Sequence, residues 1–163
     1  SQQITATNQE LMSVRNALGN SAAAAAPSGG AASLTETPTD PQALYDTAYN
    51  DYLRGNYDLA ILGFQRYAGN FPDTQLTDNA IYWIGESYFS QRKYQQAIAQ
   101  FDTILTDYPR SDKTASAILK KGYAYLELGL VEQGEVQLRN VIQQFPSSDE
   151  ANLARQRLSN LGR

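Results

Sequence analysis

The sequence predicts an all-α fold, an α-solenoid of three helix pairs closed by a C-terminal capping helix. Three observations support this prediction. Pro72, Pro109 and Pro146 recur at a constant spacing of 37 residues. Columns of small residues and a column of large apolar residues keep the same spacing between those prolines. A fixed period between about 20 and 50 residues is typical of solenoid proteins.

Each repeat contains two helical patterns. In the second repeat, Ile81, Ile84 and Tyr88 share one face of a first helix, and Ala97 and Phe101 share one face of a second. The recurring proline ends the second helix, because the residue before a proline is disfavoured in the α conformation. The repeats are predicted at about residues 41–74, 78–111 and 115–148.

Small residues mark the points where the helices of a pair should cross. Two helices approach closely only where neither carries a bulky side chain, and a large apolar residue then fills the space beside the crossing. The small columns are Ala48, Gly85 and Gly122, and Ala60, Ala97 and Gly134, and the large column is Phe64, Phe101 and Leu138. Gly55 and Gly129 lie between the two helices of a pair, where a left-handed residue is expected.

Both ends of the repeat array carry helix signals. Asp40 followed by Pro41 predicts an N-cap with proline at the first helical position. Ser147 and Glu150 have the spacing of a capping box, which predicts the start of the last helix at residues 149–161. That helix has apolar residues on one stripe and polar residues elsewhere, as a solenoid cap requires.

The chain before the repeats divides into two segments. Residues 1–18 read as the end of a heptad helix, a coiled-coil remnant, because Ile4, Leu11 and Leu18 are spaced by seven. A frayed amphipathic tail is the other reading of this segment. Residues 19–39 are rich in Ala, Ser and Gly, which predicts a flexible linker. Residues 40–163 form the repeat domain.

Composition excludes several classes of function. The net charge of −4, with 13 basic and 17 acidic residues, argues against nucleic-acid binding. The absence of cysteine and histidine removes thiol chemistry, the commonest general base and the commonest metal ligands. Paired acidic residues such as Asp102 and Asp107 are better explained as a solvated helix face than as an acid–base pair. We therefore expect no enzyme, no cofactor, no metal and no membrane insertion.

The repeat columns resemble the tetratricopeptide pattern, with a period three residues longer than usual. The run Asn79-Ala80-Ile81-Tyr82-Trp83-Ile84-Gly85-Glu86, the aromatic-Pro-x-Ser/Thr closure and the preceding Ala/Ser/Gly linker resemble one bacterial envelope family. This is the Tol–Pal-associated cell division coordinator family, of the YbgF or CpoB type. Its members combine an export signal, a trimerising coiled coil, a linker and three such repeats; residues 1–163 show no export signal and only a short heptad segment.

The resemblance implies a non-enzymatic scaffold of the periplasm. It implies binding to a TolA-like envelope protein and a peptidoglycan synthase, which links wall synthesis to outer-membrane constriction during cell division. It also implies a homotrimer through the coiled coil of the full-length protein. The alternative function is a repeat subunit of an outer-membrane protein assembly complex, whose lipoproteins share the aromatic-Pro-x-Ser closure.

The first helix of each pair is expected to face the concave surface, where a partner protein would bind. The candidate partner-binding residues are Tyr45, Tyr49, Tyr52, Asn79, Tyr82, Glu86, Phe89 and Tyr123. Tyrosine offers a large contact area and a hydroxyl at low entropic cost, which favours a binding surface. The other reading is that several of these side chains pack between repeats as core. Trp83 is expected to be a structural anchor rather than a ligand contact.

Chaperone-docking tetratricopeptide domains hold the terminal carboxylate of a peptide with Lys and Asn side chains on these helices. In this chain Tyr45 and Tyr49 stand at the corresponding positions of the first pair, and Lys120 alone cannot form such a clamp. The sequence therefore favours an apolar or helical ligand in the groove.

Overall fold

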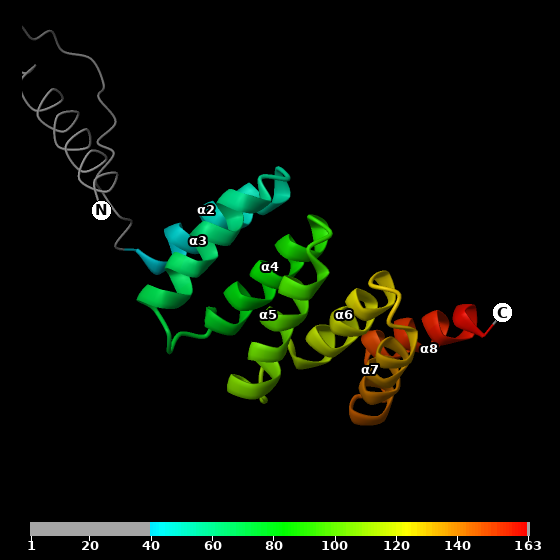
Figure 1. Ribbon diagram of the computed structural model, residues 1–163. Helices are drawn as coiled ribbons and strands as arrows, with labels where there is room; N and C mark the ends of the chain where they lie inside the picture. Colours follow the sequence, from blue (N-terminus) through cyan, green and yellow to red (C-terminus); the bar gives the residue numbers. More distant parts are fainter. Residues whose placement is uncertain (1–39, 163) are drawn as a thin grey trace, which may run out of the picture. The chain divides into compact units, whose positions relative to one another are not determined.

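The computed structural model describes residues 40–162, and all the secondary structure in this range is α-helical. The predicted segments 1–18 and 19–39 lie outside the described residues. Three helix pairs follow one another and a single helix completes the array (Figure 1). The helices are α2 (Pro41–Leu53), α3 (Tyr57–Asn70), α4 (Thr77–Ser90), α5 (Tyr94–Asp107), α6 (Thr114–Glu127), α7 (Val131–Gln144) and α8 (Asp149–Leu161). This arrangement confirms the predicted all-α solenoid of three helix pairs and a capping helix.

Each helix packs mainly against its neighbours in sequence. Contacts also join α2 to α4 and α6 to α8, whereas no comparable contact joins α3 to α5 or α5 to α7 within residues 40–162. A hydrogen bond between Glu86 on α4 and Lys120 on α6 links the remaining two of these helices. We call the surface formed by α2, α4, α6 and α8 the inner face.

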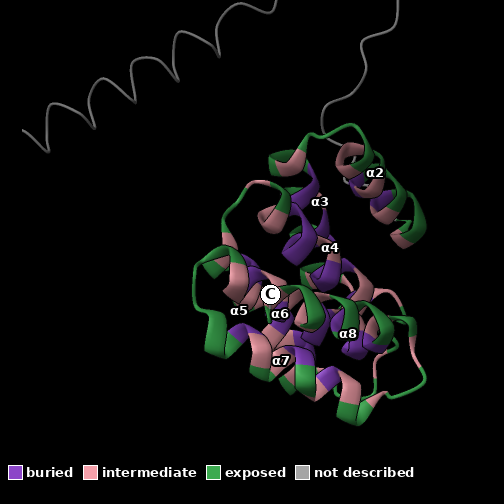
Figure 2. Ribbon diagram, turned by 90° about the vertical axis from the view of Figure 1, so that its right-hand side faces the viewer, coloured by how far each residue is buried: buried purple, intermediate pink, exposed green. Residues whose placement is uncertain are grey.

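Small residues lie at the helix crossings, as the sequence predicts. Ala48, Ala60 and Ala97 are at most 1% exposed. A Cβ atom placed on Gly85 would lie 2.6 Å from Cε1 of Phe101, closer than real Cβ contacts. Phe101 is fully buried, as are its counterparts in the other pairs, Phe64 and Leu138. In Figure 2 buried residues, in purple, alternate along the helices with intermediate residues in pink and exposed residues in green.

The turn inside each pair needs one left-handed residue. Gly55 has φ of +79° and Gly129 has φ of +75°, which confirms the prediction for both glycines. In the second pair the same position is Arg92, whose φ is +60°. A residue with a Cβ atom is strained in this region by roughly 1 kcal/mol relative to glycine. Packing of α4 against α5 therefore holds Arg92 in a conformation that its own backbone disfavours.

Side-chain caps begin only two of the seven described helices, the first and the last. The Asp40 carboxylate accepts a hydrogen bond from the backbone N–H of Gln42 at 3.1 Å, with Pro41 in the first turn, as predicted. At α8 the predicted capping residue is wrong by one position. Ser148, not Ser147, is the N-cap, and its Oγ accepts from the N–H of Ala151. Glu150 accepts a hydrogen bond from Ser116 Oγ at 2.6 Å on α6.

Candidate functional site

An aromatic cluster occupies the inner face where the first pair meets the second. The ring of Trp83 on α4 lies 4.9 Å from the ring of Tyr49 and 4.8 Å from the ring of Tyr52, both on α2. All three side chains are half-buried. Trp83 therefore joins the two pairs, as an anchor should, and it also presents part of its ring to the groove.

A hollow of about 230 Å³ lies beside this cluster. It is lined by Tyr45 and Tyr49 from α2, by Asn79 and Trp83 from α4, and by Lys113 just before α6. Burial raises the pKa of Tyr45 to about 12, and a side-chain hydrogen bond with Trp83 opposes that rise. Asn79 Oδ1 is buried and has no hydrogen-bond partner among the described residues. The lining residues of the hollow thus include aromatic rings, an amide oxygen without a hydrogen-bond partner and a lysine.

Glu86 lies further along α4 on the same face and is almost fully buried, at 8% exposure. Its Oε2 accepts a hydrogen bond from Lys120 Nζ on α6 at 2.7 Å, and Lys120 also lies over the ring of Phe89. Burial raises the pKa of Glu86, and the positive charge of Lys120 opposes that shift. The ammonium group of Lys120 is already bonded to Glu86 within the protein. This gives a physical reason for the prediction that Lys120 forms no clamp for the carboxylate of a peptide.

Tyr82 is the most buried tyrosine of the predicted set, at 9% exposure. Its ring packs 5.5 Å from that of Trp83 and 5.8 Å from that of Phe101. Burial raises its pKa well above the usual range, and the nearby carboxylate of Glu86 adds to the rise. Tyr82 is thus built into the packing between α4 and α5, so that little of its surface is open to a partner.

A second hollow opens near the other end of the inner face. Its lining residues are Phe89 from α4, Tyr123 and Glu127 from α6, and Arg157 from α8. Phe89 and Tyr123 are half-buried, as are Tyr45, Tyr49, Tyr52 and Asn79. The predicted set therefore divides into six half-buried side chains and two buried ones, Tyr82 and Glu86. The half-buried six can each offer surface to a partner.

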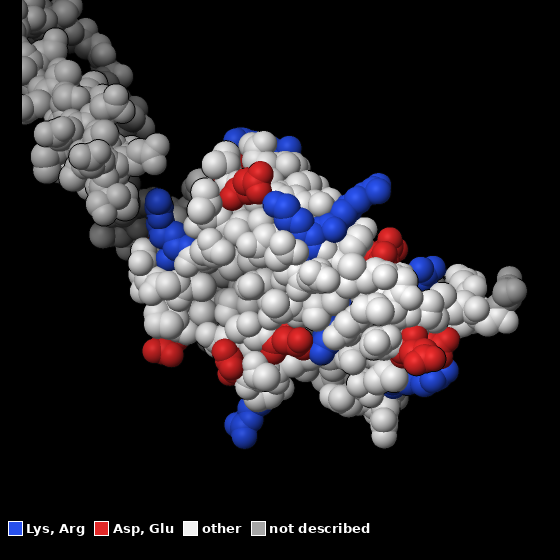
Figure 3. Space-filling view, viewed as in Figure 1, with Lys and Arg blue, Asp and Glu red and all other residues white. Residues whose placement is uncertain are grey.

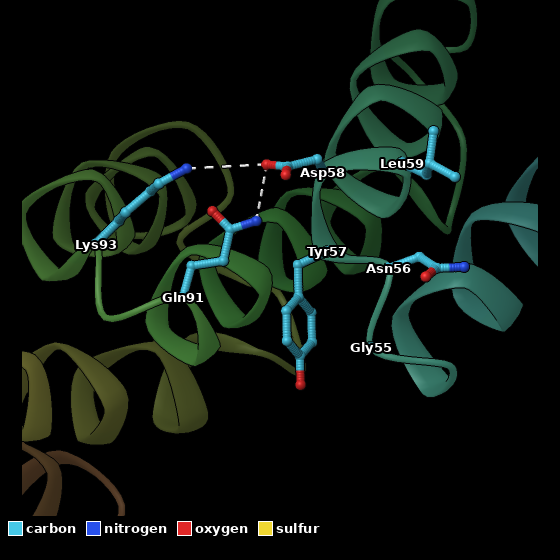
Figure 4. A pocket seen from close by; sticks show the side chains of 7 residues that line it. All are labelled: Gly55, Asn56, Tyr57, Asp58, Leu59, Gln91 and Lys93. Carbon is cyan, nitrogen blue, oxygen red and sulfur yellow. Dashed lines mark hydrogen bonds and ion pairs between the residues drawn. The ribbon is translucent and has the colours of Figure 1, made fainter.

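A further hollow of about 560 Å³ lies at the turn of the first pair, where Tyr57 lines it (Figure 4). There Gln91 Nε2 donates a hydrogen bond to Asp58 Oδ1 at 2.8 Å, and Lys93 Nζ lies 3.8 Å from the same oxygen. Tyr57 points away from these groups (Figure 4). The arrangement ties the second pair to the start of α3, and its polar groups are largely engaged with one another.

Sequence reasoning missed two contributors to the inner face. Lys113 precedes α6 and reaches the first hollow, although it lies far along the chain from Tyr45. The pairing of Glu86 with Lys120 joins residues 34 apart, a separation close to the repeat period of 37. Equivalent positions of successive repeats lie side by side in a solenoid, so this spacing was the available signal.

Charges on the face shown in Figure 3 are interspersed, with acidic and basic groups close to one another. In the described part of the chain, no three acidic side chains gather as a metal site would require. Nor does any helix of residues 40–162 have both the length and the apolar character to cross a membrane.

Solved structures similar to this chain are tetratricopeptide domains. The Arabidopsis OM64 domain has 16% identity and a TM-score of 0.59, and the match covers 74% of this chain and 94% of that one. The first domain of human RPAP3 has 17% identity and a TM-score of 0.59, with coverages of 74% and 90%. The first domain of Spaghetti (RPAP3), bound to an HSP90 peptide, has 18% identity and a TM-score of 0.58, with coverages of 76% and 94%. These likenesses show the fold.

Matches to family models agree with the fold and identify the protein family. No curated protein sequence matches the chain. A tetratricopeptide repeat model matches residues 42–74, which cover the first helix pair. A second model, YfiO, described as an outer membrane lipoprotein, matches residues 74–159, just over half of the chain. With its repeats of the tetratricopeptide type, the chain belongs to the outer membrane lipoprotein (YfiO) family.

Proposed function

We propose that this protein is a non-enzymatic adaptor of the periplasm, which holds a partner protein on its inner face. The observation that carries the proposal is the half-buried aromatic cluster of Tyr49, Tyr52 and Trp83, beside a hollow whose lining residue Asn79 has an unpaired amide oxygen. Large aromatic side chains and a few polar groups are typical of the residues that contribute most to protein binding.

The proposed role is to link the Tol–Pal system to peptidoglycan synthesis during division and outer-membrane constriction. The resemblance of the Asn79–Glu86 run and of the repeat closure to the cell division coordinator family supports this role. Its partners would be a TolA-like protein and a peptidoglycan synthase. Membership in an outer membrane lipoprotein family supports a location in the bacterial envelope.

The family match also favours a second candidate, a repeat subunit of an outer-membrane protein assembly complex. It spans the second and third helix pairs and most of α8, which are the parts that carry Glu86, Phe89 and Tyr123. Both candidates use the same inner face, and they differ in the protein that occupies it.

The first domain of Spaghetti (RPAP3) is bound to an HSP90 peptide, and the second domain of human RPAP3, 18% identical with a TM-score of 0.57, is in complex with an HSP70 peptide. Both similar structures indicate a way of binding in which the repeats receive a peptide segment. We propose that the repeats of this protein also bind a peptide segment. We do not propose that the segment is an HSP90 or HSP70 peptide. Lys120 is bonded to Glu86, and tyrosines line the first pair, so the inner face favours aromatic contacts with a helical or apolar segment.

A binding experiment with purified proteins separates the two candidates. The full chain is immobilised and exposed in turn to a TolA-like protein, a peptidoglycan synthase and another component of an outer-membrane protein assembly complex. Binding of the TolA-like protein, weakened at least about tenfold by Tyr49→Ala, supports the first candidate. Tyr125→Ala is the matched control, because Tyr125 lines a hollow with residues of α7 rather than with α2 and α4.

Exclusive binding of the assembly component would replace the first candidate with the second. Equal effects of Tyr49→Ala and Tyr125→Ala would contradict the assignment of the inner face as the binding surface. Release of soluble fragments from purified peptidoglycan by the protein would contradict the non-enzymatic proposal as a whole.

A further inference from the structure

Glu86 combines deep burial with incomplete hydrogen bonding. Its side chain is 10% exposed, and Oε2 is bonded to Lys120. The other oxygen, Oε1, is buried and has no partner among residues 40–162. A carboxylate can accept about four hydrogen bonds, and native proteins rarely leave a buried acceptor without a donor. The inner face thus retains a carboxylate that its own side chains satisfy only in part.

The repeats show that folding does not require a carboxylate at this position. The equivalent residues of the first and third pairs, 37 residues away on each side, are Tyr49 and Tyr123. Both lie on the same surface of their pairs and are half-buried. Glu86 therefore replaces an aromatic residue that serves the neighbouring pairs. A buried polar group without a partner in a native protein calls for an explanation, and a functional role is one.

The groups around Glu86 suit a cation. Burial raises the pKa of Tyr52 and of Tyr82, and the negative charge of the nearby Glu86 carboxylate adds to both rises. The ammonium group of Lys120 already lies 5.3 Å from the centre of the Phe89 ring, so a positive charge is accommodated beside this aromatic residue. Lys120 is 28% exposed and bonds only Oε2, and its long, flexible side chain can shift enough to admit a second donor to Oε1 without losing that bond.

We propose that Glu86 receives a lysine or arginine side chain of the partner protein, which donates to Oε1 while Lys120 keeps Oε2. This inference rests on the proposed function, since it requires a partner on the inner face. Asn79 Oδ1 is a second open acceptor seven residues earlier on α4, about 10 Å away along the helix. The segment that fits therefore carries two donor side chains about that distance apart, as at positions i and i+7 of a helix.

The chain contains its own control. Lys121, next to Lys120, is bonded to Asp102 on α5 rather than to a residue of the inner face. Glu86→Gln and Asp102→Asn each remove one negative charge and one partner of a lysine. General attraction of a basic ligand to an acidic chain changes equally in both variants. Only the Glu86 substitution alters the proposed site.

The test uses the full chain and three synthetic helical peptides. They share one alanine–leucine sequence and differ at two positions seven residues apart, which hold Lys, Gln or Glu. Trp83 is the chain's one tryptophan, and it lies in the aromatic cluster, so its fluorescence reports binding locally. We expect the Lys peptide to bind about tenfold more tightly than the Gln peptide at 150 mM salt. Glu86→Gln should abolish that difference, and Asp102→Asn should preserve it.

Several outcomes overturn the inference. Equal affinities of the Lys and Gln peptides for the unaltered chain would do so, although a partner on the inner face would still be consistent with the proposed function. Equal losses in the two variants would reveal general charge attraction only. An unchanged peptide affinity together with a lowered melting temperature in Glu86→Gln would show that Glu86 serves packing alone. Failure of every peptide to alter Trp83 fluorescence would also reject it.

Discussion

The two ends of the repeat array are finished differently. At the C-terminal end, α8 places Ala151 and Ala154 against the third pair, where both are fully buried, and turns polar residues such as Arg155 and Gln156 outward. At the other end, the groove between α2 and α3 is lined by residues such as Ala48 and Gly63, and no other described helix covers it. Leu59 and Leu62 beside it are 55% and 61% exposed.

Residues at equivalent positions of the first and second pairs show how far the first pair is suited to its exposure to solvent. Ile84 of the second pair is 3% exposed because α3 packs over it, and its counterpart in the first pair is the exposed Thr47. A polar residue thus replaces an apolar one where the covering helix is missing. The reverse holds for Leu59, whose counterpart in the second pair is Gln96. The C-terminal end is therefore covered by a helix with a polar outer side. The N-terminal end has no covering helix among the described residues, and its exposed surface is only partly polar.

The largest difference between the ends should appear when a charge is introduced. Ala154→Asp places a carboxylate in the fully buried contact of α8, and we expect a loss of about 3 kcal/mol in the free energy of unfolding. Ala43→Asp is the matched change on the exposed side of α2, with an expected effect within about 0.5 kcal/mol. Urea unfolding measures both. Similar losses at the two sites would remove the distinction between a closed and an open end.

The helix caps should differ less. Ser148→Ala removes the half-buried cap of α8 and should lower the free energy of unfolding by about 1 kcal/mol. Asp40→Ala removes the solvent-exposed cap of α2 and should cost about 0.5 kcal/mol. Thermal unfolding of both variants gives the comparison. A greater loss for Asp40→Ala would show that the first helix contributes more to the array than its exposure suggests.

A pH-dependent contribution is expected at the closed end. Hydrogen bonding from Ser116 lowers the pKa of Glu150, so its contribution to stability is present above the ordinary pKa near 4.5 and is lost as the pH falls through the lowered value. Unfolding measured from pH 6 to pH 3 should show this loss. Glu150→Gln should remove that part of the pH dependence. An unchanged profile in the variant would mean that the bond to Ser116 adds nothing to the docking of α8.

The smallest effect on stability is expected at the exposed leucine. Leu62→Ser should change the free energy of unfolding by no more than about 0.5 kcal/mol, because the side chain is 61% exposed. It should, however, reduce the binding of a dye that detects apolar surface. Leu138→Ser, at a fully buried position of the third pair, is the destabilising control. A loss from Leu62→Ser as large as that of Leu138→Ser would show that the groove is covered in solution.

Sequence reasoning reached the fold because the crossings repeat. Each column of small residues serves one contact, and the period of 37 places that contact three times. Asp40 is predicted as a helix cap because the proline after it marks the start of a helix. The sequence prediction chooses Ser147 as the other cap, but the adjacent Ser148 is the N-cap. Sequence reasoning could not separate groove from core among the tyrosines. Tyr49 and Tyr82 differ in burial because different residues of other helices pack against them. The sequence pattern of one helix does not show those contacts.

The substantial contacts among the described helices join elements that are first or second neighbours along the chain. Little chain entropy is therefore lost in closing any one contact, and proteins of such low contact order fold quickly. Folding can begin at whichever pair forms first and spread to the next. Local unfolding should begin at the ends of the array, where a helix has neighbours on one side only. Amide hydrogens of α2 and α8 should therefore exchange with solvent before those of the central pair.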